Sequence, residues 1–195
     1  MKIISKGSRI TVLTTCLTIA LGGGLLSTTV NAATAQTIKS SEVRAAQASK
    51  ITLKQAITIA NKKVAGTLIS ADFDDEDDKA KGGVYEIEIN TDTHNYEVKV
   101  DALTSKIIST EKNRLDRDDI ADYKTLKQAK VTIMNAMSIA EKATSGRVLG
   151  IEFKNDRDYA DHKSYYEVKI LKQDHIVELD IDATTGKVFN SEIKK

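Results

Sequence analysis

The sequence predicts an α+β fold of two tandem repeats, each with one helix packed on a four-stranded antiparallel meander sheet. Two observations lead to this prediction. The segment at 166–187, YEVKILKQDHIVELDIDATTGK, repeats the segment at 85–106, YEIEINTDTHNYEVKVDALTSK, with a constant offset and no insertion, which indicates a duplicated supersecondary unit. Hydrophobic and polar residues also alternate within both segments, as they do in strands with one buried and one solvated face.

The composition is that of a globular chain. Hydrophobic residues make up 41% of the 195 residues and charged residues 29%, which is typical of a folded rather than a disordered protein. Cys16 is the only cysteine, so the chain cannot form an internal disulfide.

Residues 1–32 read as a signal peptide. Its positively charged start consists of Lys2, Lys6 and Arg9. The uncharged apolar run 10–30 follows, and the small residues at its end predict cleavage after Ala32. An uncleaved membrane anchor is the alternative, because the run is just long enough to span a bilayer. A lipoprotein signal is disfavoured, because Thr15 rather than a smaller residue precedes Cys16.

Cleavage predicts a secreted or cell-envelope protein without stable membrane insertion. The leader carries three positive charges and no negative charge, so its removal changes the net charge from +1 to −2. A slightly acidic chain does not attract nucleic acid or an anionic membrane surface, so we expect neither as a partner.

Two segments lie outside the predicted repeats. Residues 33–50 are rich in Ala, Ser, Thr and Gln and lack a large apolar face, which predicts a flexible spacer. A frayed helix over 42–48 is the alternative. Residues 113–130 are dense in charge at first and helical in composition later, so a solvated linker and a rigid connector both remain open.

One helix is expected to begin each repeat, over 51–66 and over 131–146. Both segments carry apolar residues at helical spacing, and the sequence TLKQ at 52–55 forms a capping box. Gly66 and Gly146 follow the helices, where a residue with positive φ commonly ends the last turn.

Four strands are expected after each helix. The residues expected on the inner face are Ile69, Ala71, Phe73, Tyr85, Ile87, Ile89, Tyr96, Val98 and Val100, and then Leu149, Ile151, Phe153, Tyr166, Val168, Ile170, Val177, Leu179 and Ile181. The predicted repeats span 51–112 and 131–195. Units of about 60–65 residues are marginal alone, which favours packing of the two repeats together.

These segments resemble the PepSY domain family in an ordered set of short motifs. The motif residues of the first repeat are Gly66, Tyr85, Asp101 and Lys106, and those of the second are Gly146, Tyr166, Asp182, Gly186 and Lys187. The first repeat departs from the family pattern at Ser105, where the family prefers glycine.

The resemblance implies an extracytoplasmic, non-catalytic module. The family occurs in propeptides of secreted metallopeptidases and as stand-alone secreted or membrane-tethered proteins, and its domains are thought to inhibit or restrain peptidases. It therefore implies a protein partner, with a peptidase as the first candidate. A cell-envelope structural or adhesion protein without a peptidase target is the alternative.

The residues themselves show no catalytic motif. There is no H-E-x-x-H, G-x-S-x-G or C-x-x-C motif and no phosphate-binding glycine loop, which disfavours an enzyme, and we expect no cofactor. His94 and His175 match across the repeats at a turn and read as polar turn residues rather than metal ligands. Tyr85 and Tyr166 read as core residues whose hydroxyls reach the sheet edge.

An acidic run in the first repeat is the only candidate for metal binding. The candidate Ca²⁺ ligands are Asp72, Asp74, Asp75, Glu76, Asp77 and Asp78. The run lacks the glycine and distal glutamate of an EF-hand loop and has no counterpart in the second repeat. We therefore expect a solvated loop, no bound metal and little effect of Ca²⁺ on stability.

The last turn of each repeat predicts a specific backbone conformation. Asp101 and Asp182 open these turns, where their carboxylates can accept backbone N–H groups. Gly186 suits the left-handed residue that closes such a hairpin. A shared register places Ser105 in that same conformation, at a cost of roughly 1 kcal/mol relative to glycine.

Overall fold

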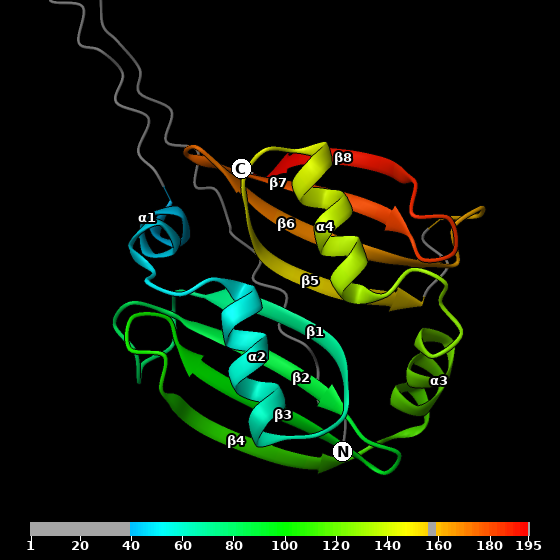
Figure 1. The fold of residues 1–195 in the computed structure, drawn as a ribbon, viewed down its shortest axis with the longest axis horizontal. Helices are drawn as coiled ribbons and strands as arrows, with labels where there is room; N and C mark the ends of the chain where they lie inside the picture. Colours follow the sequence, from blue (N-terminus) through cyan, green and yellow to red (C-terminus); the bar gives the residue numbers. More distant parts are fainter. Residues whose placement is uncertain (1–39, 156–158, 195) are drawn as a thin grey trace, which may run out of the picture. The chain divides into compact units, whose positions relative to one another are not determined.

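The computed structural model describes residues 40–155 and 159–194, in which two copies of a helix and four strands follow one another (Figure 1). The first copy consists of α2 (Leu53–Lys63), β1 (Thr67–Asp74), β2 (Val84–Asn90), β3 (His94–Asp101) and β4 (Ile107–Arg114). The second consists of α4 (Ile133–Ala143), β5 (Arg147–Asn155), β6 (Ser164–Lys172), β7 (His175–Asp182) and β8 (Val188–Lys194). The predicted fold class is confirmed. The predicted leader and its cleavage site lie outside the described residues.

All eight strands form one antiparallel sheet in the order β4-β3-β2-β1-β5-β6-β7-β8. The two meanders meet at a central seam, where Ser70 of β1 lies opposite Glu152 of β5 and Ala71 lies opposite Ile151. From the seam outwards, each half of the sheet continues with the second, third and fourth strand of its repeat. An approximate twofold axis through the seam therefore relates the two repeats. The two repeats therefore share one sheet.

Helices α2 and α4 lie side by side on one face of this sheet (Figure 1). Their buried residues are Leu53, Ala56, Ile57 and Ala60 in α2 and Ile133, Ala136, Met137 and Ala140 in α4. These side chains join the inward residues of both meanders in one hydrophobic cluster. Since the cluster crosses the seam, the two repeats stabilise each other.

Matched β-bulges change the predicted alternation at the start of β1 and β5. The register shifts between Leu68 and Ser70 and between Val148 and Gly150. A bulge sets two residues against one, so the parity of the preceding residues changes. Leu68 is consequently buried, whereas Ile69, which was expected to face inward, is only partly buried.

Gly66 and Gly146 are required for close packing and not for a left-handed conformation. The positive-φ glycines are Gly83 and Gly186, so the expectation of positive φ at Gly66 and Gly146 is wrong. A Cβ at Gly66 would lie 2.5 Å from Ile89 Cγ2, and a Cβ at Gly146 would lie 2.5 Å from the Leu171 carbonyl oxygen. Only glycine lets the chain leave the helix this close to the neighbouring strand.

Two further helices occupy the segments outside the repeats. Part of the expected flexible spacer is helix α1 (Ser41–Ala48), because Val43 and Ala46, three residues apart, bury one small apolar face against the core. The connection between the repeats contains α3 (Arg117–Leu126), which buries Tyr123 and Leu126 and is therefore an ordered connector. Within the described residues, every helix is too short or too polar to span a membrane.

Candidate functional site

The family-motif tyrosines connect each sheet to the start of its helix. Tyr85 and Tyr166 have no exposed surface. The Tyr85 hydroxyl donates to the Ile51 carbonyl at 3.0 Å, and the Tyr166 hydroxyl donates to the Val131 carbonyl at 2.6 Å. Burial raises the pKa of Tyr166 to about 12. Both tyrosines are therefore core residues on interior strands, and each hydroxyl bonds to a carbonyl just before a helix rather than at an edge strand.

The motif aspartates organise the last turns. Asp101 accepts hydrogen bonds from the backbone N–H groups of Leu103 and Thr104 at 2.9 and 2.6 Å. Asp182 accepts from the matching N–H groups of Thr184 and Thr185. Ser105 has φ 60° and Gly186 has φ 73°, so the predicted left-handed position of Ser105 is confirmed.

Lys106 and Lys187 close these turns through their backbone. The Asp101 N–H donates to the Lys106 carbonyl at 2.9 Å, and the Asp182 N–H donates to the Lys187 carbonyl at 3.0 Å. The two lysines therefore act in the turns through main-chain atoms. The motif residues are parts of the fold, and a binding surface has to be sought elsewhere.

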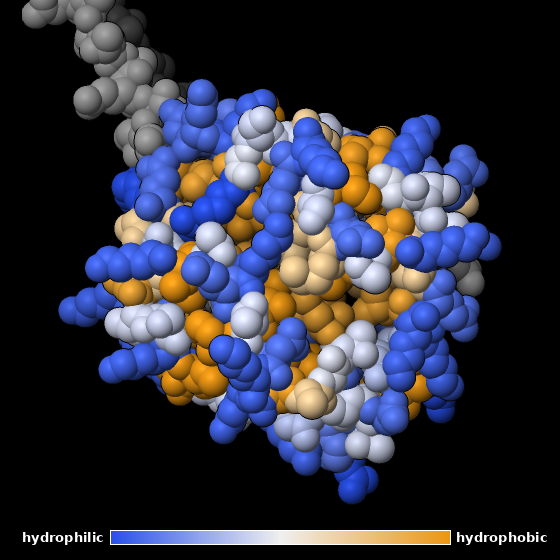
Figure 2. Space-filling model, viewed as in Figure 1, coloured by the Kyte–Doolittle hydropathy of each residue, from blue (hydrophilic) through white to orange (hydrophobic). Residues whose placement is uncertain are grey.

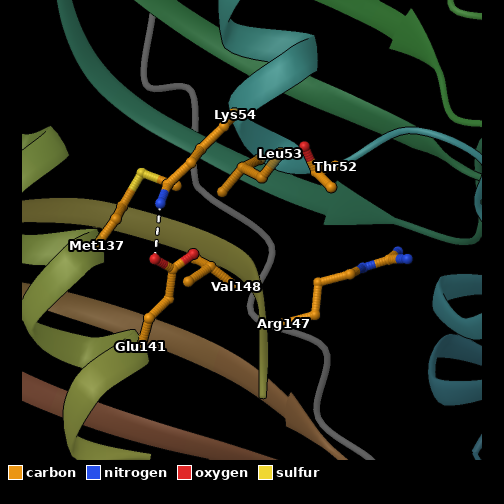
Figure 3. A pocket seen from close by; sticks show the side chains of 7 residues that line it. All are labelled: Thr52, Leu53, Lys54, Met137, Glu141, Arg147 and Val148. Atoms are coloured by element: carbon orange, nitrogen blue, oxygen red, sulfur yellow. Dashed lines mark hydrogen bonds and ion pairs between the residues drawn. The ribbon is translucent and has the colours of Figure 1, made fainter. Parts of the chain in front are cut away.

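A small pocket lies between the start of α2, α4 and the start of β5, on the face where hydrophobic and hydrophilic side chains are mixed (Figure 2). Its lining residues are Thr52, Leu53, Lys54, Met137, Glu141, Arg147 and Val148. Lys54 and Glu141 form an ion pair of 2.7 Å across it, and the Arg147 guanidinium points away from that pair (Figure 3). Its volume of about 80 Å³ holds two or three water molecules and is far below that of a typical organic-ligand pocket.

The acidic run is divided between different neighbours. Asp72 pairs with Lys169 Nζ across the seam at 2.7 Å, and Asp74 accepts from the Glu76 N–H at 2.8 Å. Asp77 accepts from Lys99 Nζ at 3.1 Å. Although Asp74 and Asp77 lie together with Glu86, that cluster already contains the ammonium of Lys99. Glu76 and Asp78 are exposed to solvent.

A row of carboxylates crosses the face of the sheet that is turned away from α2 and α4. The residues directly opposite one another along the row are Glu111, Glu97, Glu88, Ser70, Glu152, Glu167, Asp180 and Asn190, one from each strand from β4 to β8. Like charges directly opposite each other in a sheet are destabilising. This cost makes the row the most unusual feature of this face of the sheet.

The electrostatics of the row agree with that repulsion. Burial raises the pKa of Glu88, and the carboxylates of Glu97 and Glu152 raise it further. Burial also raises the pKa of Glu167, with Glu178 as the next cause. In the neighbouring row, by contrast, Lys99 and Lys169 pair with carboxylates across the strands.

Sequence reasoning did not single out this row. Its six carboxylates lie on six different strands, so their adjacency appears only when the register of the whole sheet is known. One signal was available: the constant offset between the repeats matches Lys99 with Asp180, a change from a cation to an anion. The matched histidines behave as expected, since His94 and His175 lie at the turns that begin β3 and β7.

Comparisons with known proteins identify the repeats. A family model of the PepSY domain, described as peptidase propeptide and YPEB domain, matches residues 50–111 and 130–192. A search of curated proteins finds no match. Among solved structures, the chain is similar to a protein of Clostridium difficile 630 described as a putative lipoprotein. The two are 25% identical with a TM-score of 0.46, over 78% of this chain and 99% of that one.

Proposed function

The chain belongs to the PepSY family, and we propose that it acts outside the cytoplasm as a non-catalytic module that binds a peptidase and restrains it. The observation that carries this proposal is the double family match, 50–111 and 130–192, to a domain described as a peptidase propeptide. Each matched segment contains one helix, three complete strands and most of the fourth, since the matches end within β4 and β8.

A binding role rather than a catalytic one is supported by the state of the histidines. His162 bonds to Asp182 at 2.7 Å and stacks on Phe189, while His94 bonds to Thr93 at 2.8 Å. A general base needs a nucleophile or substrate proton within hydrogen-bond reach. Within the described residues these histidines instead hold turns and loops in place.

Binding to a protein is also supported by the form of the sheet. Among the described strands, β4 and β8 each pair with one neighbour, so each leaves a row of backbone N–H and C=O groups open. Sheet edges of this kind accept an extended segment of a partner as an additional strand. Their charged residues, such as Lys112 in β4 and Glu192 in β8, limit unspecific edge pairing.

The peptidase proposal is tested by adding the purified chain 33–195 to the peptidases of a culture supernatant. We expect the turnover of a peptide substrate to fall and to level off once the chain is in excess over one peptidase. Intact-mass measurement of the chain afterwards provides the control, because a chain that acts as a competing substrate is cleaved. Unchanged turnover together with retention on cell-wall material would support the envelope structural or adhesion protein instead.

The extracytoplasmic location rests on the leader pattern and is tested separately. Protein collected outside the producing cells is expected to begin near Ala33, and intact-mass measurement reads that start directly. Secreted protein that still contains residues 1–30 would exclude the cleaved leader.

A further inference from the structure

Three carboxylates come together at the second-repeat end of the acidic row. Glu167 of β6 lies directly opposite Asp180 of β7, and Glu178 lies two residues before Asp180 on the same face. One oxygen from each of the three lies within 4.8 Å of the others. Three negative charges at this spacing repel one another unless a cation or a proton lies between them.

The first repeat shows how the same three positions are neutralised. The constant offset matches Glu86 with Glu167, Glu97 with Glu178, and Lys99 with Asp180. The Lys99 ammonium contacts Glu86, lies 3.8 Å from Glu97, and also pairs with Asp77. The hydrogen bond to Glu86 holds the pKa of Lys99 above its usual value. The first repeat therefore carries its own cation at the position where the second carries a third carboxylate.

The buried carboxylate of Asp180 provides a second observation that points to a cation. It is only 3% exposed. Its Oδ2 accepts hydrogen bonds from Tyr159 at 2.7 Å and Asn190 at 2.9 Å. Its Oδ1 is also buried, and no residue in the described ranges donates a hydrogen bond to it. A buried carboxylate oxygen without a partner is costly, so this oxygen is available as a ligand.

The lysines nearby neutralise only part of this charge. Lys194 Nζ lies 2.7 Å from both Glu178 and Glu192, but its side chain is 45% exposed, so solvent weakens its effect. Lys169 is paired with Asp72 across the seam, and Lys154 is paired with Glu152 at 2.6 Å. Lys169 also lies directly opposite Glu178, and the charge of Lys154 acts on Glu167. Because each of these three lysines is shared with a carboxylate outside the cluster, the cluster keeps an excess of negative charge over the described residues.

We propose that Glu167, Glu178 and Asp180 bind a hard divalent cation, with Ca²⁺ as the best match. Carboxylate oxygens alone favour hard cations over zinc or copper. Ca²⁺ accepts six to eight oxygens in irregular geometry and fills its remaining positions with water, whereas Mg²⁺ demands a near-ideal octahedron. A site with three side-chain ligands on one sheet face suits a weak site, with a dissociation constant on the order of 10⁻⁴–10⁻³ M as in extracellular modules.

This proposal departs from the expectation of no bound metal, which stays a prediction, and it concerns residues other than the acidic run. It is independent of the peptidase proposal, because cation binding is measured without any peptidase.

Titration calorimetry and terbium luminescence of the chain 33–195 test the site. Terbium replaces Ca²⁺ and is sensitised by nearby tyrosines, which are the relevant donors because the chain has no tryptophan and Tyr159 bonds to Asp180. We expect one Ca²⁺ per chain, with little response to Mg²⁺. Asp180→Asn and Glu167→Gln should each weaken binding at least tenfold, whereas Asp74→Asn in the acidic run should leave it unchanged.

A gain-of-site variant makes use of the matched first repeat. Lys99→Asp recreates the three-carboxylate arrangement with Glu86 and Glu97, so the stoichiometry should rise from one ion to two. Circular dichroism establishes that each variant is folded, and Glu167→Gln at a partly exposed position serves if Asp180→Asn does not fold. Absence of Ca²⁺ binding in the millimolar range, or binding that survives both Asp180→Asn and Glu167→Gln, would overturn the proposal.

Discussion

The last turn of the first repeat holds Ser105 at φ 60°, and the matching turn of the second repeat holds Gly186 at φ 73°. The backbone is the same although only one of the two residues adopts it without strain. The aspartate that opens each turn and the N–H groups that it binds are also the same. The turn conformation is thus set by the aspartate and the strand pairing, and the residue at the left-handed position only changes its cost.

The two repeats also differ on the outer face of the sheet. The first repeat places Lys99 among carboxylates, whereas the second places Asp180 there. This difference leaves the strands and their register unchanged. The comparison teaches that duplication has preserved the residues that determine the backbone, while residues of the outer face have been free to change sign.

The largest loss of stability is expected at Gly66 and Gly146, where the chain of each repeat passes close to a neighbouring strand. Gly66→Ala and Gly146→Ala each place a Cβ within 2.5–2.7 Å of a neighbouring strand's atoms, so each should lower the free energy of unfolding by about 2–3 kcal/mol. Denaturant unfolding measures both values. Ala65→Ser, at an exposed neighbouring position, is the control and should change stability by about 0.5 kcal/mol or less. Tolerance of alanine in only one repeat would break the equivalence of the two helix ends.

The stability of the second repeat should depend more strongly on acid pH than that of the first repeat, because of Asp182 in its last turn. Although burial acts to raise it, hydrogen bonds from His162, Thr185 and Thr184 lower the pKa of Asp182 to about 2. A carboxyl with a lowered folded-state pKa stabilises the fold above its unfolded value near 3.9, and this stabilisation is lost as the pH falls towards about 2. Asp182→Asn should therefore flatten the fall in stability over this range.

The matched control for this experiment is Asp101→Asn. The pKa of Asp101 is also lowered by backbone hydrogen bonds from Thr104 and Leu103, against the effect of burial, but Asp101 has no histidine partner. Asp101→Asn should therefore flatten the acid dependence less. Equal effects of the two substitutions in urea unfolding between pH 4 and pH 2 would show that His162 adds nothing to the turn.

The two turns also predict opposite responses to exchanged residues. Ser105→Gly relieves a strain of roughly 1–2 kcal/mol and adds about 0.4–1 kcal/mol of unfolded-chain entropy. Because the Ser105 hydrogen bond to Thr104 is exposed and local, its loss costs little, and a small gain in stability is expected. Gly186→Ser should cost about 1 kcal/mol, because the new Cβ meets the left-handed strain and lies 3.1 Å from Ile139. A loss of stability in Ser105→Gly would contradict this account of the turn.

The smallest effect is expected at the helix starts. Thr52 and Gln55 form a complete capping box, in which the Thr52 N–H donates to the Gln55 side chain. Thr132 accepts from the Asn135 N–H, but the Thr132 N–H donates no bond to the Asn135 side chain. The longer side chain in Asn135→Gln should complete the box and add a few tenths of a kcal/mol. Thermal unfolding compares this variant with Gln55→Asn, which should lose a similar amount.

Much of the fold could be predicted from the sequence, because hydrophobic alternation and a constant repeat are local patterns. They were sufficient for the order of helix and strands and for the left-handed position of Ser105. They were insufficient at the two bulges, where Leu68 is buried in place of Ile69 and Val148 is buried in addition to the expected Leu149. The sequence also did not reveal why a glycine is needed at position 66, because the need comes from the close contact with Ile89 of β2.

The candidate site was harder to predict for the same physical reason. The acidic run Asp72–Asp78 stands out in the sequence, yet its carboxylates find separate partners in the fold. Asp180 lies between Glu178 and Asp182 in an ordinary strand alternation, yet the fold adds Glu167 from another strand and the hydroxyl of Tyr159. Proximity across strands depends on the register, which neighbouring residues do not reveal.

The seam between β1 and β5 has a consequence for how the two repeats came to be joined in one chain. Its twofold arrangement allows two separate copies of a single repeat to pair in the same way, since β1 or β5 alone would be an open edge. We expect residues 130–194 produced alone to dimerise, as sedimentation would measure, and a soluble monomer would contradict this. The ordered connection through α3 turns such an encounter into an intramolecular one, at an effective concentration on the order of millimolar. The chain is in this sense a tethered dimer that stays assembled at any dilution.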